Sequence, residues 1–134
     1  MSEKRKRTER ILIIDDEPDI ASLLKTALEY DGSFTNVHTF DDPFLALSNF
    51  KAGLYDLVIL DITMPNINGF DLYNEMRKID NKVKFCFFTG SETYHEELNE
   101  EYRSVNEDMF IRKPITIKDL LREINKRLNM NYNK

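Results

Sequence analysis

The sequence predicts a doubly wound α/β sandwich of the (βα)5 type, in which a five-stranded parallel sheet carries helices on both faces. Two observations predict this fold class. Short apolar runs alternate five times with helical patterns, and this alternation is typical of parallel sheets. Most of the runs are continuous in their apolar character, as expected of strands covered on both faces. The chain has 134 residues, 41% of them hydrophobic, which suits a single domain.

The expected strands are the short apolar runs. Four continuous runs occur at residues 11–14, 57–60, 83–88 and 109–111. The run at residues 34–40 mixes apolar and polar residues, which predicts a strand at the edge of the sheet. Right-handed crossovers between successive parallel strands place the intervening helices on the two faces.

The expected helices are indicated by apolar spacing and by residues that favour helix N-termini. Apolar residues follow the i, i+3, i+4, i+7 spacing of one helix face from Ile20 to Leu28 and from Ile117 to Leu128. A further helix is expected over residues 94–104, where four glutamates crowd one another. Helix starts are expected at four polar positions: Asp42 before Pro43, Asn68, Thr93 and Thr116.

Residues capable of chemistry stand where four of the five expected strands end. The first strand runs into Asp15 and Asp16, the third into Asp61, the fourth into Thr89 and the fifth into Lys113. Parallel strands bring these ends to one rim of the sheet, where doubly wound folds bind their ligands. The sequence therefore predicts one site with three carboxylates, a hydroxyl and an ammonium group.

Each of these residues also has a purely structural explanation. Asp15 and Asp16 could favour the positive end of the next helix, and Asp61 could serve a turn. Thr89 could cap a helix, and Lys113 could be an ordinary surface charge. The occurrence of all of them at successive strand ends favours the shared site.

The chemistry of this residue set indicates phosphoryl transfer with a divalent cation. Three neighbouring carboxylates repel one another unless a cation intervenes. Oxygen ligands without His or Cys suit Mg²⁺. A carboxylate can act as a nucleophile and become an aspartyl phosphate, while the metal and Lys113 stabilise the oxygens of the transferring group.

The chain resembles the receiver domain of two-component response regulators over residues 11–129. That resemblance implies a flavodoxin-like sheet with strand order 2-1-3-4-5. Four motifs carry it, in the order and with the separations usual in the family: Ile-Leu-Ile-Ile-Asp15-Asp16-Glu17-Pro18, Asp61-Ile-Thr-Met-Pro65 with Asn68-Gly69, Phe88-Thr89-Gly90, and Phe110-Ile-Arg-Lys113-Pro114.

The resemblance assigns the metal-binding roles residue by residue. Asp61 is expected to be the phosphoacceptor. Asp16 and Asp61 are expected to bind Mg²⁺ directly, together with the backbone carbonyl of Thr63. Asp15 is expected to act through a metal-bound water.

The remaining roles concern the phosphoryl group and the conformational switch. Lys113 and the Thr89 hydroxyl are expected to contact the phosphoryl oxygens, and backbone N–H groups of Thr63 and Gly90 to donate to them. Pro114 is expected to follow a cis peptide bond. Phe110 stands at the family's switch position, so phosphorylation is expected to reshape the face made by the fourth helix, fifth strand and fifth helix.

The function implied is that of a signalling phosphoacceptor, limited to self-phosphorylation and autodephosphorylation, rather than an enzyme. Its expected partners are a sensor histidine kinase or phosphotransfer protein and, downstream, a protein target or an absent output domain. A phosphorylation-dependent dimer is a further option. Two alternatives stay open: a receiver-like interaction module that is not phosphorylated, and a haloacid-dehalogenase-type Mg²⁺ phosphatase, which would need a second Asp where Thr63 stands.

Charge and composition set the expected boundaries and compartment. Residues 1–10 carry five bases and two acids and are expected to form a flexible basic arm, and residues 130–134 a short tail. Because the whole chain has a net charge of −5, the folded part is acidic and is not expected to bind nucleic acid. Its apolar runs are too short to span a membrane, and the lone Cys86 has no disulfide partner in the chain. A cytoplasmic protein is expected.

Overall fold

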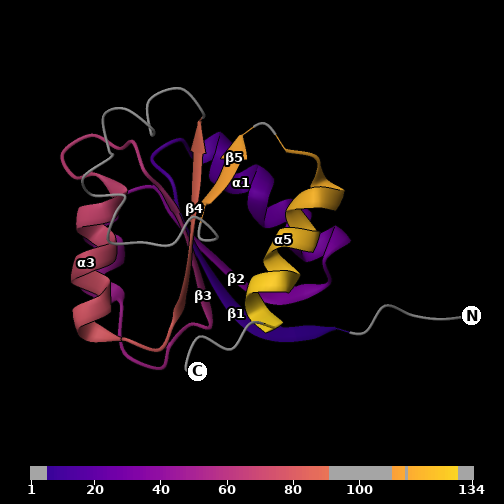
Figure 1. Ribbon diagram of the computed structural model, residues 1–134, viewed down its shortest axis with the longest axis horizontal. Helices are drawn as coiled ribbons and strands as arrows, with labels where there is room; N and C mark the ends of the chain where they lie inside the picture. Colours follow the sequence, from indigo (N-terminus) through magenta and orange to yellow (C-terminus); the bar gives the residue numbers. More distant parts are fainter. Residues whose placement is uncertain (1–5, 91–109, 114, 130–134) are drawn as a thin grey trace, which may run out of the picture.

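A computed structural model of the chain describes residues 6–90, 110–113 and 115–129 (Figure 1). The side chains of residues 89, 90, 112 and 113 lie outside this description. The strands are β1 (Arg7–Ile14), β2 (Phe34–Phe40), β3 (Leu57–Asp61), β4 (Lys84–Gly90) and β5 (Phe110–Lys113). The helices are α1 (Pro18–Thr26), which continues into a π-helical turn (Ala27–Asp31), α2 (Pro43–Asn49), α3 (Gly69–Ile79) and α5 (Ile117–Asn129).

The strands form one parallel sheet in the order β2-β1-β3-β4-β5. This order confirms the predicted sheet, including the edge position of the strand at residues 34–40. Figure 1 shows α3 on one side of the sheet and α1 and α5 on the other. The predicted doubly wound sandwich is therefore confirmed.

The two faces of the sheet bury alternate residues of the central strands. On β1, Leu12 and Ile14 pack with α2 and α3, whereas Ile11 and Ile13 pack with α1 and α5. All four side chains are fully buried. This explains why the strands read as continuous apolar runs, because both sides of the pleat face a hydrophobic layer.

Strand β1 begins at Arg7, so the last four residues of the segment expected as an arm belong to the sheet. The Arg7 amide donates to the carbonyl of Ser33, and its guanidinium lies 4.4 Å from the ring centroid of Phe34. The Arg10 guanidinium lies 3.3 Å from the carboxylate of Asp56, the residue before β3. Contacts of polar side chains at the amino-terminal end of β1 thus extend the strand beyond its apolar run.

The predicted helix starts at Asp42, Asn68 and Thr116 are confirmed by hydrogen bonds. The Asp42 carboxylate accepts from the amides of the second and third residues after it, at 2.9 and 3.3 Å. Asn68 Oδ1 accepts from the amide of Asp71 at 2.9 Å, and Thr116 Oγ1 from that of Asp119 at 3.1 Å. Thr93 and the helix expected over residues 94–104 lie outside the described residues.

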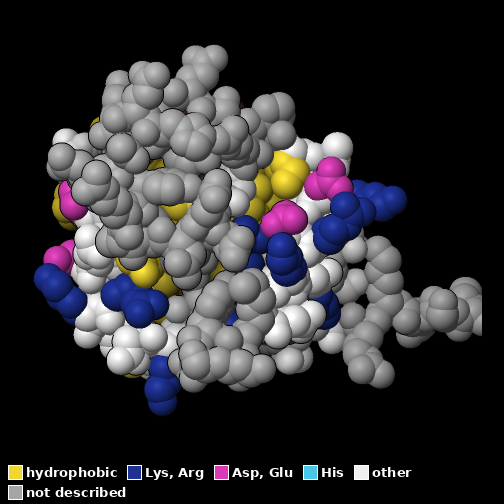
Figure 2. All heavy atoms as spheres, viewed as in Figure 1, with side chains coloured by type: hydrophobic (Ala, Val, Ile, Leu, Met, Phe, Trp, Pro, Cys, Tyr) yellow, Lys and Arg dark blue, Asp and Glu magenta, His cyan; other side chains and the backbone are white. Residues whose placement is uncertain are grey.

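Three further features concern the interior, membrane spans and the surface of α5. Cys86 is fully buried in β4, as expected of a core thiol. Among the described residues, no helix combines the length and the apolar character needed to cross a bilayer. Figure 2 shows both basic and acidic side chains over α5, which is typical of a solvated helix face.

Candidate functional site

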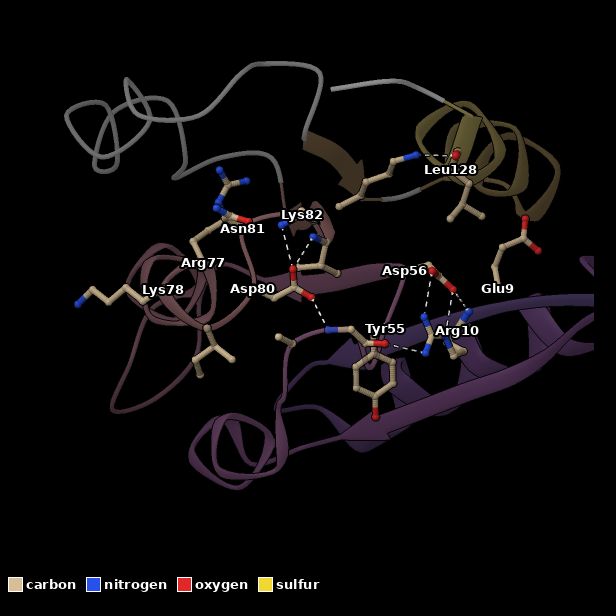
Figure 3. A pocket seen from close by; sticks show the side chains of 15 residues that line it. Glu9, Arg10, Tyr55, Asp56, Arg77, Lys78, Asp80, Asn81, Lys82 and Leu128 are labelled. Atoms are coloured by element: carbon tan, nitrogen blue, oxygen red, sulfur yellow. Dashed lines mark hydrogen bonds and ion pairs between the residues drawn. The ribbon is translucent and has the colours of Figure 1, made fainter. Parts of the chain in front are cut away.

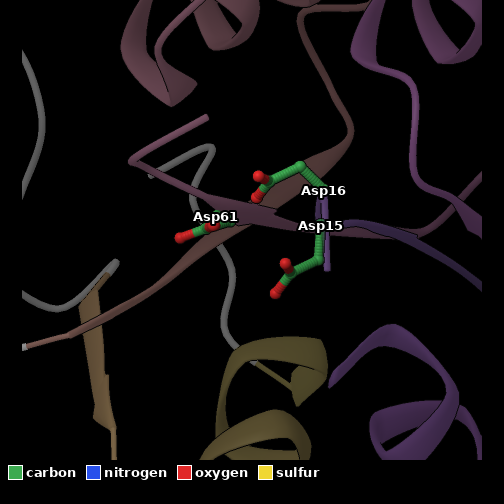
Figure 4. A group of neighbouring side chains, drawn as sticks. All are labelled: Asp15, Asp16 and Asp61. Carbon is green, nitrogen blue, oxygen red and sulfur yellow. The ribbon is translucent and has the colours of Figure 1, made fainter. Parts of the chain in front are cut away.

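Asp15, Asp16 and Asp61 come together at the carboxyl ends of two neighbouring strands (Figure 4). Asp15 follows the last residue of β1, and Asp61 is the last residue of β3. Each contributes a carboxylate oxygen, and these oxygens all lie within 4.8 Å of one another. Asp15 is 2% exposed and Asp61 8%, while Asp16 is half-buried. The structure thus brings together the three carboxylates that the sequence pointed to.

The backbone around this cluster is held by hydrogen bonds. The amide of Asp15 donates to the carbonyl of Phe40 at the end of β2, at 3.1 Å. The carboxylate of Asp15 accepts from the amide of Glu17 at 3.0 Å, where the chain turns into α1. Asp61 pairs with Phe88 of β4 in the parallel ladder. These backbone contacts therefore fix the positions from which the carboxylates of Asp15 and Asp61 project.

Gly69, at the start of α3, lies against the backbone of Asp61. A Cβ atom on Gly69 would lie 2.4 Å from the carbonyl oxygen of Asp61 and 2.8 Å from the Cα of Ile62. The Gly69 amide donates to the Ile62 carbonyl at 2.7 Å. Only glycine permits this approach, so the glycine of the third-strand motif positions the phosphoacceptor candidate.

The course of the backbone places the other expected site residues near the same rim. Thr63 is exposed in the loop after β3. Thr89 and Gly90 are the last two residues of β4, and Gly90 is paired with Lys113, the last residue of β5. The directions of the side chains of Thr89 and Lys113 are outside the description, as is Pro114 with its expected cis bond.

Phe110 begins β5 and is half-buried. Its ring stacks on Phe87 with centroids 5.3 Å apart and lies at a tilt to Phe70, 5.9 Å away. Aromatic contacts of this kind add to the stability that burial provides. The predicted switch residue therefore packs on the same side of the sheet as α3.

At the opposite end of the sheet, a cavity of about 770 Å³ lies between the α2–β3 and α3–β4 connections (Figure 3). Asp80 joins the two connections, because its carboxylate accepts from the amides of Gly53 at 2.9 Å, Lys82 at 2.9 Å and Val83 at 3.2 Å. Burial works to raise the pKa of Asp80, but these hydrogen bonds outweigh it and hold the pKa below its usual value.

Asp56 has a comparable role at the same end. Its carboxylate accepts from the Arg10 amide at 2.7 Å and meets the Arg10 guanidinium at 3.3 Å. Desolvation raises the pKa of Asp56, and the contacts with Arg10 lower it by more. Neither residue stands out in the sequence, since an aspartate in a turn has the same local pattern whether its carboxylate is solvated or binds distant parts of the chain.

The fold and the acidic rim define a doubly wound α/β domain with an oxygen-rich site at its strand ends. The chain matches the family described as the response regulator receiver domain over residues 11–125. It belongs to that family, which is one of signalling domains.

Similar proteins support this assignment. The response regulator SaeR of Staphylococcus aureus is 30% identical over 116 residues, which cover 86% of this chain and 48% of SaeR. The chain thus spans about half the length of the curated relatives it matches. Among solved structures, the CheY-like receiver protein of Methanospirillum hungatei is 26% identical with a TM-score of 0.76, covering 92% of this chain and 95% of that one. The HemR receiver domain of Leptospira biflexa is 27% identical with a TM-score of 0.78, covering 95% and 99%.

Proposed function

We propose that this receiver domain accepts a phosphoryl group on Asp61 from a histidine kinase or a phosphotransfer protein. The observation that carries the proposal is the gathering of three carboxylates within 4.8 Å, at the carboxyl ends of β1 and β3, in a chain of this family. The similar HemR receiver domain was solved as its non-phosphorylated form, which supports phosphorylation as a state that distinguishes such domains.

In the proposed transfer, a carboxylate oxygen of Asp61 attacks the phosphorus of a phosphohistidine. An O–P bond forms and the P–N bond breaks, and its electron pair stays on the imidazole nitrogen, which then takes up a proton. Asp61 is anchored as the last residue of β3, with an exposure of 8% at the rim. We propose that Lys113 and Thr89, at the ends of the neighbouring strands, bind the oxygens of the transferred group.

The donor set fits Mg²⁺, because carboxylate oxygens are the ligands this ion prefers. Asp16 and Asp61 would hold the ion with the backbone carbonyl of Thr63, and Asp15 would act through a water. When bound, the ion supplies positive charge that offsets the repulsion among the carboxylates and attracts the phosphoryl group.

The phosphodonor protein needs a docking surface next to Asp61. An apolar hollow of about 260 Å³ between α1 and α5 has Phe88, the ladder partner of Asp61, in its lining. Leu23 and Ile117 also line the hollow and are 60% and 45% exposed. Phe88 places this apolar hollow beside the strand that ends in Asp61, so we propose that an apolar helix face of the donor protein covers it.

The proposed output is a change in the face that includes β5 and α5. Phe110 is half-buried among Phe70 and Phe87, so phosphorylation would change its packing rather than a hydrogen bond of the ring. A downstream protein, an output domain or a second phosphorylated copy would bind the altered face.

The test is the amide NMR spectrum with Mg²⁺ and beryllofluoride, a mimic of the phosphoryl group. We expect shifts around Asp61 and Phe110 in the parent protein, their loss in Asp61→Asn, and their retention in Asp71→Asn, which removes an exposed carboxylate nearby in the chain. An unchanged spectrum of the folded parent would instead favour an interaction module that is not phosphorylated. Turnover of a phosphate ester would favour the phosphatase alternative.

A further inference from the structure

Arg127, near the end of α5, is buried to a degree that is unusual for arginine. Its exposure is 3%, and charged side chains are almost never fully buried unless they are paired. It follows Leu120 and Ile124 at the spacing of one helix face, and both of these are core residues. A charged guanidinium therefore stands where the helix pattern calls for an apolar side chain.

The guanidinium of Arg127 connects α5 with β5. Nη1 donates to the side chain of Glu123 at 2.7 Å and to its carbonyl at 3.0 Å. Nη2 donates to the carbonyl of Phe110, the first residue of β5, at 3.3 Å. Cys86 of β4 lies in the same hydrophobic cluster as Leu120 and Ile124, so this face of α5 also packs toward β4.

Strand β5 needs such a connection, because it has four residues and lies at the edge of the sheet, beside β4. Its last residue, Lys113, ends at the carboxylate rim, and its first, Phe110, is bound by Arg127. The end of α5 is itself fixed, since the Lys84 ammonium donates to the Leu128 carbonyl at 2.6 Å. Arg127 therefore joins the far end of β5 to a helix end that is fastened to β4.

We propose that Arg127 is a positioning residue that makes β5 and α5 move as one unit, so that a displacement of β5 at the rim reaches the surface of α5. The displacement of β5 in this inference rests on the proposed function, whereas the contacts of Arg127 that connect β5 with α5 do not depend on it. The planar fork of arginine can donate to Glu123 and to the Phe110 carbonyl at once, which the single ammonium of lysine cannot do in the same geometry. Coupling between distant sites requires an element of this kind that both sites bias.

The test compares Arg127→Met with the parent protein in the same beryllofluoride and Mg²⁺ titration. Methionine fills the apolar position without donors, and Arg127→Lys serves as the second variant if the methionine protein does not fold. Arg122→Met is the matched control, because Arg122 lies on the same helix with 64% of its side chain exposed and pairs with Asp119. We expect Arg127→Met to keep the shifts around Asp61 while the shifts of α5 amides fall several-fold. Arg122→Met should leave both sets unchanged.

Equal α5 shifts in Arg127→Met and in the parent protein would overturn the inference. If the parent shows no shift around Asp61, the proposed function fails instead, and hydrogen exchange in the absence of ligand decides the inference. Arg127→Met must then speed the exchange of β5 amides and leave that of β1 and β3 amides unchanged. Unchanged exchange in β5 would show that Arg127 does not position the strand.

Discussion

Carboxylates at the two ends of the sheet are placed in different environments. At the amino ends of the strands, Asp80 accepts from three backbone amides and Asp56 meets Arg10. At the carboxyl ends, Asp15, Asp16 and Asp61 lie within 4.8 Å of one another. The first arrangement stabilises the fold, because donors favour the charged form of a carboxylate.

The second arrangement concentrates negative charge, which costs stability unless a cation lies nearby. Such a cluster is retained where a site must attract a metal ion and a phosphoryl group, as proposed for Asp61. The contacts of a carboxylate, more than its type or its burial, thus separate a structural role from a functional one.

The largest effect is expected from glycines at the two ends. Gly69→Ala places a Cβ 2.4 Å from the Asp61 carbonyl oxygen, so we expect a loss of about 3 kcal/mol in the free energy of unfolding. Gly53→Ala at the amino end has open space but a φ of +80°, and a loss of about 1 kcal/mol is expected. Urea unfolding of the two variants measures both losses in the free energy of unfolding. Equal losses would mean that the contact at Asp61 relaxes without strain.

The second prediction concerns Asp80. Asp80→Ala leaves the amides of Gly53, Lys82 and Val83 without their acceptor, and we expect a loss of about 2 kcal/mol at neutral pH. Because the folded-state pKa of Asp80 is lowered, its contribution is present above the unfolded pKa of about 4 and is lost as the pH falls through the folded value.

Urea unfolding from pH 7 to pH 2 would test this dependence. The stability difference between parent and Asp80→Ala should shrink as the pH falls, whereas the exposed Asp41→Ala should show little difference from the parent at any pH. A difference for Asp80→Ala that stays constant down to the lowest pH would contradict the role given to its hydrogen bonds.

The third prediction is that neutralising one carboxylate at each end of the sheet changes the stability of the metal-free protein in opposite directions. Asp16→Asn relieves repulsion and should raise the stability of the metal-free protein by up to about 1 kcal/mol. Asp56→Asn weakens a half-exposed pair with Arg10 and should lower it by about 0.5 kcal/mol. Added Mg²⁺ should stabilise the parent and Asp56→Asn but not Asp16→Asn, as thermal unfolding would show. A loss of metal-free stability in Asp16→Asn would contradict the repulsive cluster.

The smallest effect is expected midway between the two ends, at Cys86. This thiol is fully buried, and burial raises its pKa to about 12. We expect no reaction of the folded protein with iodoacetamide at pH 8, and alkylation only after unfolding in urea, as mass spectrometry would detect. Rapid alkylation of the folded protein would show that the centre of β4 opens to solvent.

Much of the fold could be predicted because its signals are local. Continuous apolar runs identified the central strands and the edge strand β5, and the mixed run at residues 34–40 identified the strand at the other edge. The start of β1 at Arg7 could not be predicted, since residues 7–10 are polar and are held by contacts with residues distant in the sequence. The continuation of α1 into a π-helical turn likewise follows no pattern in its apolar spacing.

The candidate site was predictable to the extent that strand ends of a parallel sheet converge. Asp15, Asp16 and Asp61 meet for this reason. The packing of Gly69 against Asp61 and the burial of Arg127 depend on tertiary contacts. The apolar spacing of α5 places Arg127 on the same helix face as Leu120 and Ile124, but it does not indicate which acceptors the guanidinium meets there.

The most direct test of the central claim is the intact mass of the protein after incubation with Mg²⁺ and a small-molecule phosphodonor such as phosphoramidate. The claim predicts an adduct with the mass of one phosphoryl group, lost in hydroxylamine, and absent from Asp61→Asn while present in Asp71→Asn. No adduct on the folded parent protein, or an equal adduct on Asp61→Asn, would contradict it.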